Sequence, residues 1–154
     1  MAYLVDTSIL ARLANTADIY YAVAAQAVVG LHRRGELLRI APQNLVEFRS
    51  VATRPTVANG LGLSSSTAET IAATFEATFP ILDETPEIYP AWKEIMRVSG
   101  VSGKQVHDAR LAAVCHIYRI THILTFNVQH FARFTGVEPG LVVVDPISVR
   151  LGQA

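Results

Sequence analysis

The sequence predicts an α/β fold in which helices cover both faces of a mostly parallel sheet. Two observations support this prediction. Short apolar runs alternate with longer segments of helical periodicity along the 154 residues, and neither an internal repeat nor a low-complexity segment interrupts that order. Alternating strands and helices favour parallel strands joined by right-handed crossovers. We therefore interpret residues 1–154 as a single domain.

Five apolar runs are expected to form the strands: Tyr3–Val5, Leu37–Ala41, Pro80–Leu82, His122–Phe126 and Leu141–Val144. Between them, helical periodicity is clearest over residues 19–33, 43–53 and 104–118. Two further helix starts are indicated locally. Ser66 and Glu69 have the spacing of a capping box, and Thr85-Pro86-Glu87 places a cap before a proline in the first turn.

Composition and charge exclude several classes of protein. The 51% apolar content indicates a compact chain rather than a disordered one, and 13 basic and 13 acidic residues cancel. Binding of nucleic acid would therefore depend on a local patch. The single Cys115 excludes an internal disulfide and fits a reducing compartment. With no signal peptide and no apolar stretch of membrane-spanning length, we expect a cytoplasmic protein without a membrane segment.

The first predicted strand runs directly into Asp6, which is followed by Thr7 and Ser8. Open α/β sheets bind their ligands at the carboxyl ends of strands, so Asp6 is the first candidate for chemistry. The alternative is that Asp6 only caps the helix that follows, a common role for aspartate. Other carboxylates at the same end of the sheet would favour the first interpretation.

A second carboxylate, Asp108, falls on the apolar face of the helix expected over residues 104–118, together with Leu111 and Cys115. A buried charge without a partner costs several kcal/mol or shifts its pKa. Asp108 therefore needs a metal ion, hydrogen-bond donors, or an ion pair with Lys104 or Arg110. We interpret Cys115, on the same face, as a core residue.

Two more polar residues are ambiguous by themselves. Glu47 shares the polar side of the helix expected over residues 43–53 with Asn44, and most glutamates in such a position are simply solvated. Asn127 follows the fourth predicted strand. It could bind a metal ion through its carbonyl oxygen, or it could be an ordinary turn residue.

Four short motifs follow one another along the chain: Asp6-Thr7-Ser8, Asn44-Leu45-Val46-Glu47-Phe48, Val106-His107-Asp108-Ala109-Arg110-Leu111-Ala112-Ala113 and Leu124-Thr125-Phe126-Asn127. Each motif alone is weak. In this order, on an alternating strand and helix background, they resemble PIN-domain nucleases, and the match is closest to VapC-type toxins of bacterial toxin–antitoxin pairs. The resemblance covers nearly the whole chain.

The resemblance implies a three-layer α/β/α fold with a central sheet of four to five strands, and a Mg²⁺-dependent endoribonuclease in which Mn²⁺ can substitute. It also implies that Asp6, Glu47 and Asp108 are the catalytic and metal-binding residues. Ser8, Asn127 and Arg110 are candidate helpers. Many relatives have an acid in place of Asn127 and of His130, which leaves the number of metal ions open.

General chemistry agrees with this set, because Mg²⁺ prefers oxygen ligands and usually binds one or two carboxylates while keeping several waters. Asp6 and Asp108 would suffice for one ion, and Glu47 is then the candidate to orient or deprotonate a water. No His-Glu-x-x-His spacing occurs, so a zinc site is not indicated.

The resemblance also implies an RNA substrate, a small antitoxin that neutralises the protein, and self-association as a homodimer or a higher assembly with antitoxin. The segment 19–33 is more apolar than one buried stripe requires, which fits a surface covered by a partner, although a fully internal helix would look the same. Six cations are expected to flank the site and bind phosphate: Arg12, Arg49, Arg54, Lys104, Arg110 and Arg133.

An alternative function belongs to a different class. Because Asn127 and His130 depart from the acidic pattern, the chain could be a catalytically weak PIN-like domain that binds RNA or protein without cutting. A cleavage assay with Mn²⁺ present and antitoxin absent separates the two hypotheses.

Overall fold

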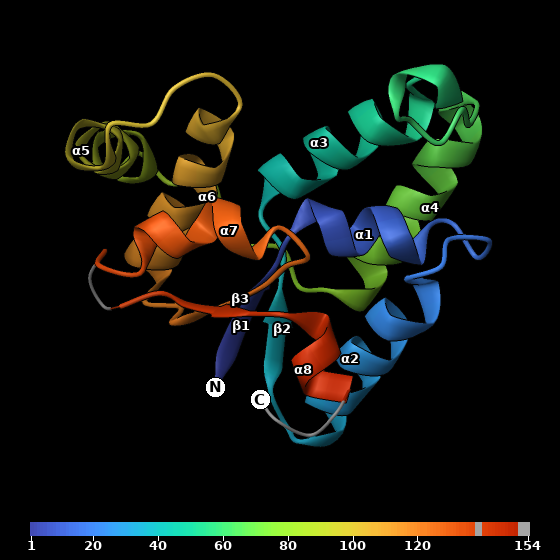
Figure 1. The fold of residues 1–154 in the computed structure, drawn as a ribbon, viewed down its shortest axis with the longest axis horizontal. Coiled ribbons are helices and arrows are strands. Elements are labelled where there is room, and N and C mark those ends of the chain that lie inside the picture. Colours follow the sequence, from blue (N-terminus) through green and yellow to red (C-terminus); the bar gives the residue numbers. More distant parts are fainter. Residues whose placement is uncertain (138–139, 151–154) are drawn as a thin grey trace.

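The computed structural model describes residues 1–137 and 140–150, which form three layers with a sheet between two groups of helices (Figure 1). The sheet contains β1 (Ala2–Val5), β2 (Leu37–Arg39), β3 (His122–Leu124) and β4 (Val142–Val144). All of its neighbouring strands are parallel, in the order β2-β1-β3-β4. The chain leaves β1 toward β2 on one side and later returns to β3 on the other. Such a switch point is where open α/β sheets bind ligands.

The two faces of the sheet carry separate cores. Tyr3 and Val5 pack into one core, whereas Leu4 between them packs into the other, as the period of two in a strand requires. The first face is covered by α1 (Thr7–Leu13), α2 (Tyr21–Arg33), α3 (Pro42–Thr53), α4 (Ser65–Thr78) and α8 (Pro146–Arg150). The second is covered by α5 (Ile88–Ser99), α6 (Gln105–Tyr118), α7 (Val128–Phe131) and the 3₁₀ turn η2 (Ala132–Phe134). A second 3₁₀ turn, η1 (Thr56–Ala58), connects α3 to α4.

These layers confirm the predicted three-layer α/β/α class, but β2, β3 and β4 are shorter than their apolar runs. The runs 37–41 and 122–126 form ladders only over Leu37–Arg39 and His122–Leu124. The prediction of a strand over Pro80–Leu82 was wrong, because this run forms only an isolated parallel bridge from Ile81 to Ile40. Apolar character reports burial, and it continues past the last hydrogen-bonded pair: Ile40 is fully buried outside the ladder.

Two predicted helix starts are also corrected. The cap of α4 is Ser64, whose hydroxyl accepts the Thr67 N–H at 3.1 Å, and not Ser66. The capping partner proposed for Ser66, Glu69, instead pairs with an arginine of α3.

The helix predicted to begin at Thr85-Pro86-Glu87 begins only at Ile88. Glu87 takes the cap position without a side-chain cap bond, because Pro86 and Glu87 lie in a turn. Similarly, α2 begins at Tyr21 rather than Ile19. Among the described residues, no helix is both long and apolar enough to cross a membrane.

Candidate active site

Asp6 lies at the centre of a buried corner between β1 and β3. Its backbone N–H donates to Leu124 O at 3.0 Å, so the residues that follow these two strands are neighbours. The residue is 3% exposed. Its Oδ2 accepts hydrogen bonds from Ser8 N–H at 3.2 Å, Ser8 Oγ at 2.6 Å and Thr125 Oγ1 at 2.7 Å. Asp6 therefore caps α1 and belongs to the site at the same time.

The two hydroxyls are oriented by the backbone that follows β3. Ser8 Oγ accepts the Phe126 N–H at 3.1 Å, and Thr125 Oγ1 accepts the Asn127 N–H at 2.9 Å. Each hydroxyl has one proton, so accepting from the backbone leaves that proton for Asp6 Oδ2. The other oxygen, Oδ1, accepts no hydrogen bond from the part of the chain that the structure describes and stays available to a ligand.

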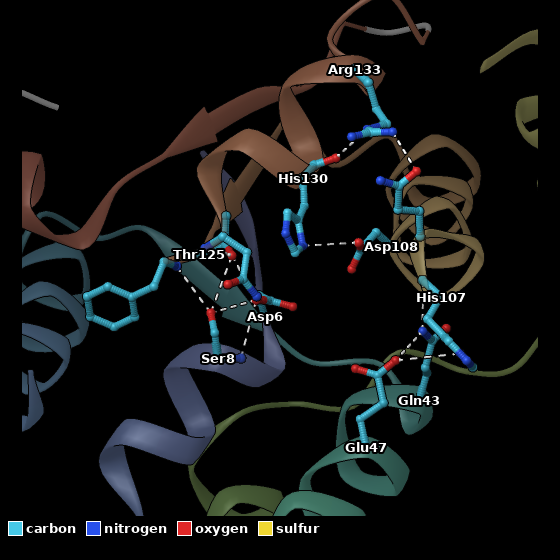
Figure 2. Close-up of polar contacts among 12 residues, drawn as sticks. Asp6, Ser8, Gln43, Glu47, His107, Asp108, Thr125, His130 and Arg133 are labelled. Atoms are coloured by element: carbon cyan, nitrogen blue, oxygen red, sulfur yellow. Dashed lines mark hydrogen bonds and ion pairs between the residues drawn. The ribbon is translucent and has the colours of Figure 1, made fainter. Parts of the chain in front are cut away.

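Asp108 faces this corner from the first turn of α6. Its side chain is 19% exposed, and its Oδ2 lies 3.5 Å from Nδ1 of His130. The pKa of Asp108 is raised to about 6. Burial is the largest cause, followed by the negative charge of Asp6; Glu47 adds to the rise, while His130 and His107 oppose it. Figure 2 shows the carboxylates of Asp6, Glu47 and Asp108 directed toward one another across the same opening. The structure thus places three carboxylates around one opening.

Glu47 is held by three elements and is not a freely solvated glutamate. Its Oε2 accepts the Thr7 hydroxyl at 2.7 Å, and its Oε1 accepts Gln43 Nε2 at 2.7 Å and lies 4.0 Å from Nδ1 of His107. The side chain keeps 27% exposure. Glu47 is therefore positioned at the opening while it remains reachable from solvent.

Gln43, which the sequence did not single out, connects the two helical layers. Its amide nitrogen donates both to Glu47 and to the carbonyl oxygen of His107, at 2.9 Å. Its carbonyl oxygen accepts Nη1 of Arg110 at 3.0 Å, and Arg110 also contacts Glu84. Arg110, the candidate helper, thus contacts Gln43, which in turn contacts Glu47.

Asn44 corrects the predicted polar stripe on α3. The sequence placed it with Glu47 on a solvent-facing side, yet it is fully buried. Its Oδ1 accepts the Ala41 N–H at 2.8 Å, and its Nδ2 donates to Thr7 Oγ1 at 3.2 Å. The signal that could have revealed it is its place as the third residue of a helix that begins with proline, where a polar side chain reaches back to the helix cap.

Asn127 and His130 lie at the same end of the sheet as the carboxylates. Asn127 is exposed, stands at the amino end of α7 and makes no side-chain cap bond. One helical turn later, His130 approaches Asp108. A histidine therefore lies beside Asp108.

The predicted flanking cations are only partly brought to the site. Arg133 donates to Gln105 Oε1 at 2.6 Å and to the carbonyl oxygen of His130, beside Asp108 (Figure 2). Arg49 instead pairs with Glu69 and Glu76 on α4. The expectation for Arg49 was therefore wrong, because its partners on α4 engage the guanidinium.

A metal ion would be held by few protein atoms here. Within residues 1–137 and 140–150, no group of three or more His, Cys, Asp or Glu side chains is arranged to hold a metal ion. The donor set still fits Mg²⁺, which typically takes one or two carboxylates and keeps several waters. Asp6 Oδ1 and the Asp108 carboxylate are the groups suited to it. Cys115 is no alternative ligand, because burial raises the pKa of its thiol.

The sequence profile of the PIN domain matches residues 3–137, which include all three carboxylates. The chain belongs to the PIN domain family. The resemblance drawn from the four motifs is thereby confirmed at the level of the family, whereas the roles of individual residues remain predictions. No curated protein matches the chain.

The fold is that of solved VapC-type PIN domain structures. VapBC2 from Rickettsia felis, bound to a DNA fragment from its promoter, matches with a TM-score of 0.66 and 17% identity over 94% of this chain and 98% of that one. VapBC-1 from nontypeable Haemophilus influenzae gives 0.62 and 17%, over 95% and 98%. VapC20 from Mycobacterium tuberculosis, described as a Sarcin-Ricin loop cleaving toxin, gives 0.62 and 20%, over 84% and 93%. At these identities the likeness establishes the fold.

Proposed function

We propose that this PIN domain protein is a Mg²⁺-dependent endoribonuclease, with Mn²⁺ able to substitute, and that it acts as the toxin of a toxin–antitoxin pair in the cytoplasm. The observation that carries the proposal is the meeting of Asp6, Glu47 and Asp108 at the β1/β3 switch point, where burial and then the negative charges of Asp6 and Glu47 raise the pKa of Asp108, to about 6. A divalent cation at this place relieves the repulsion. PIN family membership and the VapC-type fold support the proposal.

The chain's own residues would divide the work as follows. Asp6 and Asp108 hold the ion, and Ser8 and Thr125 keep Asp6 in one orientation through their hydroxyls. When bound, Mg²⁺ polarises the phosphate and lowers the pKa of water. Glu47, fixed on both oxygens, accepts a proton from the water that attacks the phosphodiester.

A small antitoxin is the proposed protein partner. α2 buries Val23 and Leu31 but leaves Val29 exposed, so it is not fully internal in this chain. Val29, Leu37 and neighbouring residues line a groove of about 510 Å³ between α2 and β2, which suits an apolar segment of an antitoxin. Co-expression with a small neighbouring reading frame, followed by co-purification, tests this partner and the assembly state.

The decisive experiment measures RNA cleavage by the wild type and by Asp6→Asn and Asp108→Asn, with Mg²⁺ and with excess EDTA. We expect the wild type to cut only with the metal and both variants to lose cleavage while remaining folded. Asp83→Asn, an exposed aspartate that contributes no carboxylate contact to the site, is the matched control and should cut normally. Full cleavage by both site variants, or undiminished cleavage in EDTA, would refute the proposal.

The non-cutting alternative also has observations in its favour. Asn127 stands where a fourth acid could, and the described acids form no three-residue metal group. If the wild type binds RNA but leaves it intact with Mn²⁺ present and antitoxin absent, this second function replaces the first.

A further inference from the structure

Beside the carboxylates lies a cluster that the proposed chemistry does not use, formed by Arg12, Tyr20 and Phe126 and called here the aromatic platform. The ring centroids of Tyr20 and Phe126 are 5.4 Å apart, with 47° between the ring planes. Cζ of Arg12 lies 5.9 Å from each centroid. Tyr20 is 39% exposed, so part of this cation–aromatic surface faces solvent.

The aromatic platform is joined directly to the Asp6 corner. Phe126 follows Thr125 in the chain, and its N–H donates to Ser8 Oγ, which in turn donates to Asp6. Arg12 comes four residues after Ser8 on α1, and residues at this spacing are neighbours on one face of a helix. The platform is thus one helical turn from the hydroxyl that orients Asp6.

Asp18 contacts both Tyr20 and Arg12, but it does not engage every nitrogen of the Arg12 guanidinium. Oδ1 of Asp18 accepts the Tyr20 N–H at 2.8 Å, and Oδ2 lies 3.5 Å from Nη1 of Arg12. Nε of Arg12 is buried and has no hydrogen-bond partner in the described residues. A guanidinium placed only for an ion pair would meet Asp18 in a bidentate pair. Here Arg12 makes a single contact to Asp18, and its Cζ lies at the same distance, 5.9 Å, from both ring centroids.

We propose that the aromatic platform stacks an unpaired nucleobase of single-stranded RNA next to the scissile phosphate. Aromatic rings and guanidinium planes are the surfaces on which proteins stack splayed bases, and each stacked base contributes about 1–3 kcal/mol with little sequence preference. Bases within a duplex are already stacked, so this surface selects single strands and loops. The inference rests on the proposed ribonuclease function and adds to it a binding site for one base, formed by Arg12, Tyr20 and Phe126.

The chain offers a matched control for this chemistry. On α5, Tyr89 is 60% exposed, with its ring centroid 5.6 Å from that of Trp92 and 5.7 Å from Nζ of Lys93. This cluster also combines rings with a cation. Trp92 packs against the second core, as Phe126 packs against the first, and it donates its indole N–H to Val106 O at 2.8 Å. What differs is the location, because among the described residues no hydrogen bond or ion pair joins Tyr89 to the Asp6 corner.

The test measures the affinity of short single-stranded RNAs, each with 2-aminopurine at one position, for the full chain carrying Asp108→Asn, so that cleavage does not consume the probe. In this background, Tyr20→Leu should weaken binding about five- to a hundredfold and abolish the fluorescence quenching at one probe position. Tyr20→Phe keeps the ring and should bind normally, as should Tyr89→Leu. A thermal melt checks that each variant is folded, and Phe126→Leu serves as the second variant if Tyr20→Leu does not fold.

Equal affinity of Tyr20→Leu and Tyr20→Phe overturns the proposal, as does an equal loss with Tyr89→Leu. If Tyr20→Leu leaves RNA binding intact but prevents co-purification of the antitoxin, the platform is a protein contact and the proposal is wrong. Failure of the proposed function is seen separately. If the wild type cuts no RNA but its RNA binding depends on Tyr20, the ribonuclease function is refuted and the base-stacking proposal is supported.

Discussion

The candidate site has two sides that are built in different ways. The sheet side, Asp6 with Ser8 and Thr125, is buried between β1 and β3, and three hydrogen bonds converge on one carboxylate oxygen. The helix side consists of Glu47 on α3 and Asp108 on α6, both partly exposed. Here burial and neighbouring negative charges raise the pKa of Asp108.

The two sides therefore affect the stability of the folded state differently. Hydrogen bonds to a charged group contribute about 1.5–3 kcal/mol each when the charge is buried, so the sheet side stabilises the native state. A carboxylate whose pKa is raised is held in its charged form at a cost near neutral pH. The helix side therefore lowers stability at neutral pH. Substitutions on the two sides should change stability in opposite directions.

The largest effect is expected for Asp108→Asn without metal. The pKa of Asp108 is raised from its ordinary value of 3.8 to about 6, so the folded wild type binds this proton more tightly than the unfolded chain. Its free energy of unfolding therefore falls as the pH rises from about 4 to about 6. Asp108→Asn removes this loss and should be more stable at pH 8 by up to about 3 kcal/mol, with no such gain at pH 4. Urea unfolding at both pH values measures it.

Adding Mg²⁺ tests the same comparison between the wild type and Asp108→Asn. Because an ion bound only by the folded state stabilises it, adding Mg²⁺ should raise the stability of the wild type and narrow its gap to Asp108→Asn. A variant that is less stable than the wild type at pH 8 without metal would show that the helix side does not carry electrostatic strain.

On the sheet side, Thr125→Val should lower stability. The substitution keeps the shape of a fully buried side chain but removes the hydroxyl that donates to Asp6 and accepts from Asn127. Loss of a hydrogen bond to a buried charge costs about 1–3 kcal/mol, and cleavage should fall because Asp6 loses its orientation. Thr125→Ser retains the hydroxyl and is the control. Unchanged urea midpoints for Thr125→Val would mean that this bond does not hold Asp6.

The sheet side could largely be predicted from the sequence. An apolar run that ends in Asp6 at a strand terminus already locates the carboxylate, since parallel strands bring their carboxyl ends together. Thr125 lies inside a recognised motif, yet its role was missed. A threonine next to a buried strand looks like any other β-forming residue until its partner, 119 positions away, is known.

The helix side was less predictable for a physical reason. The apolar stripe of α6 singled out Asp108, but Glu47 gained meaning only from the family resemblance, because helical periodicity does not distinguish a fixed glutamate from a solvated one. Gln43 gave no signal at all. Its contacts to α6 depend on how closely two layers approach, and that distance is set by packing rather than by any local pattern.

The smallest effect is expected for Gln43→Met, which tests whether Gln43 positions Glu47 or binds the RNA itself. Gln43→Met removes the donors to Glu47 and to the carbonyl oxygen of His107 while keeping a similar length. Since Glu47 remains bonded to Thr7, we expect a change in stability within about 1 kcal/mol. The value of kcat should fall several-fold with KM unchanged, because a loss confined to the transition state lowers kcat and not ground-state binding. Gln26→Met, an exposed position on α2, is the control. An increase in KM at constant kcat would instead place Gln43 in direct contact with the RNA and make the link between α3 and α6 part of the binding surface.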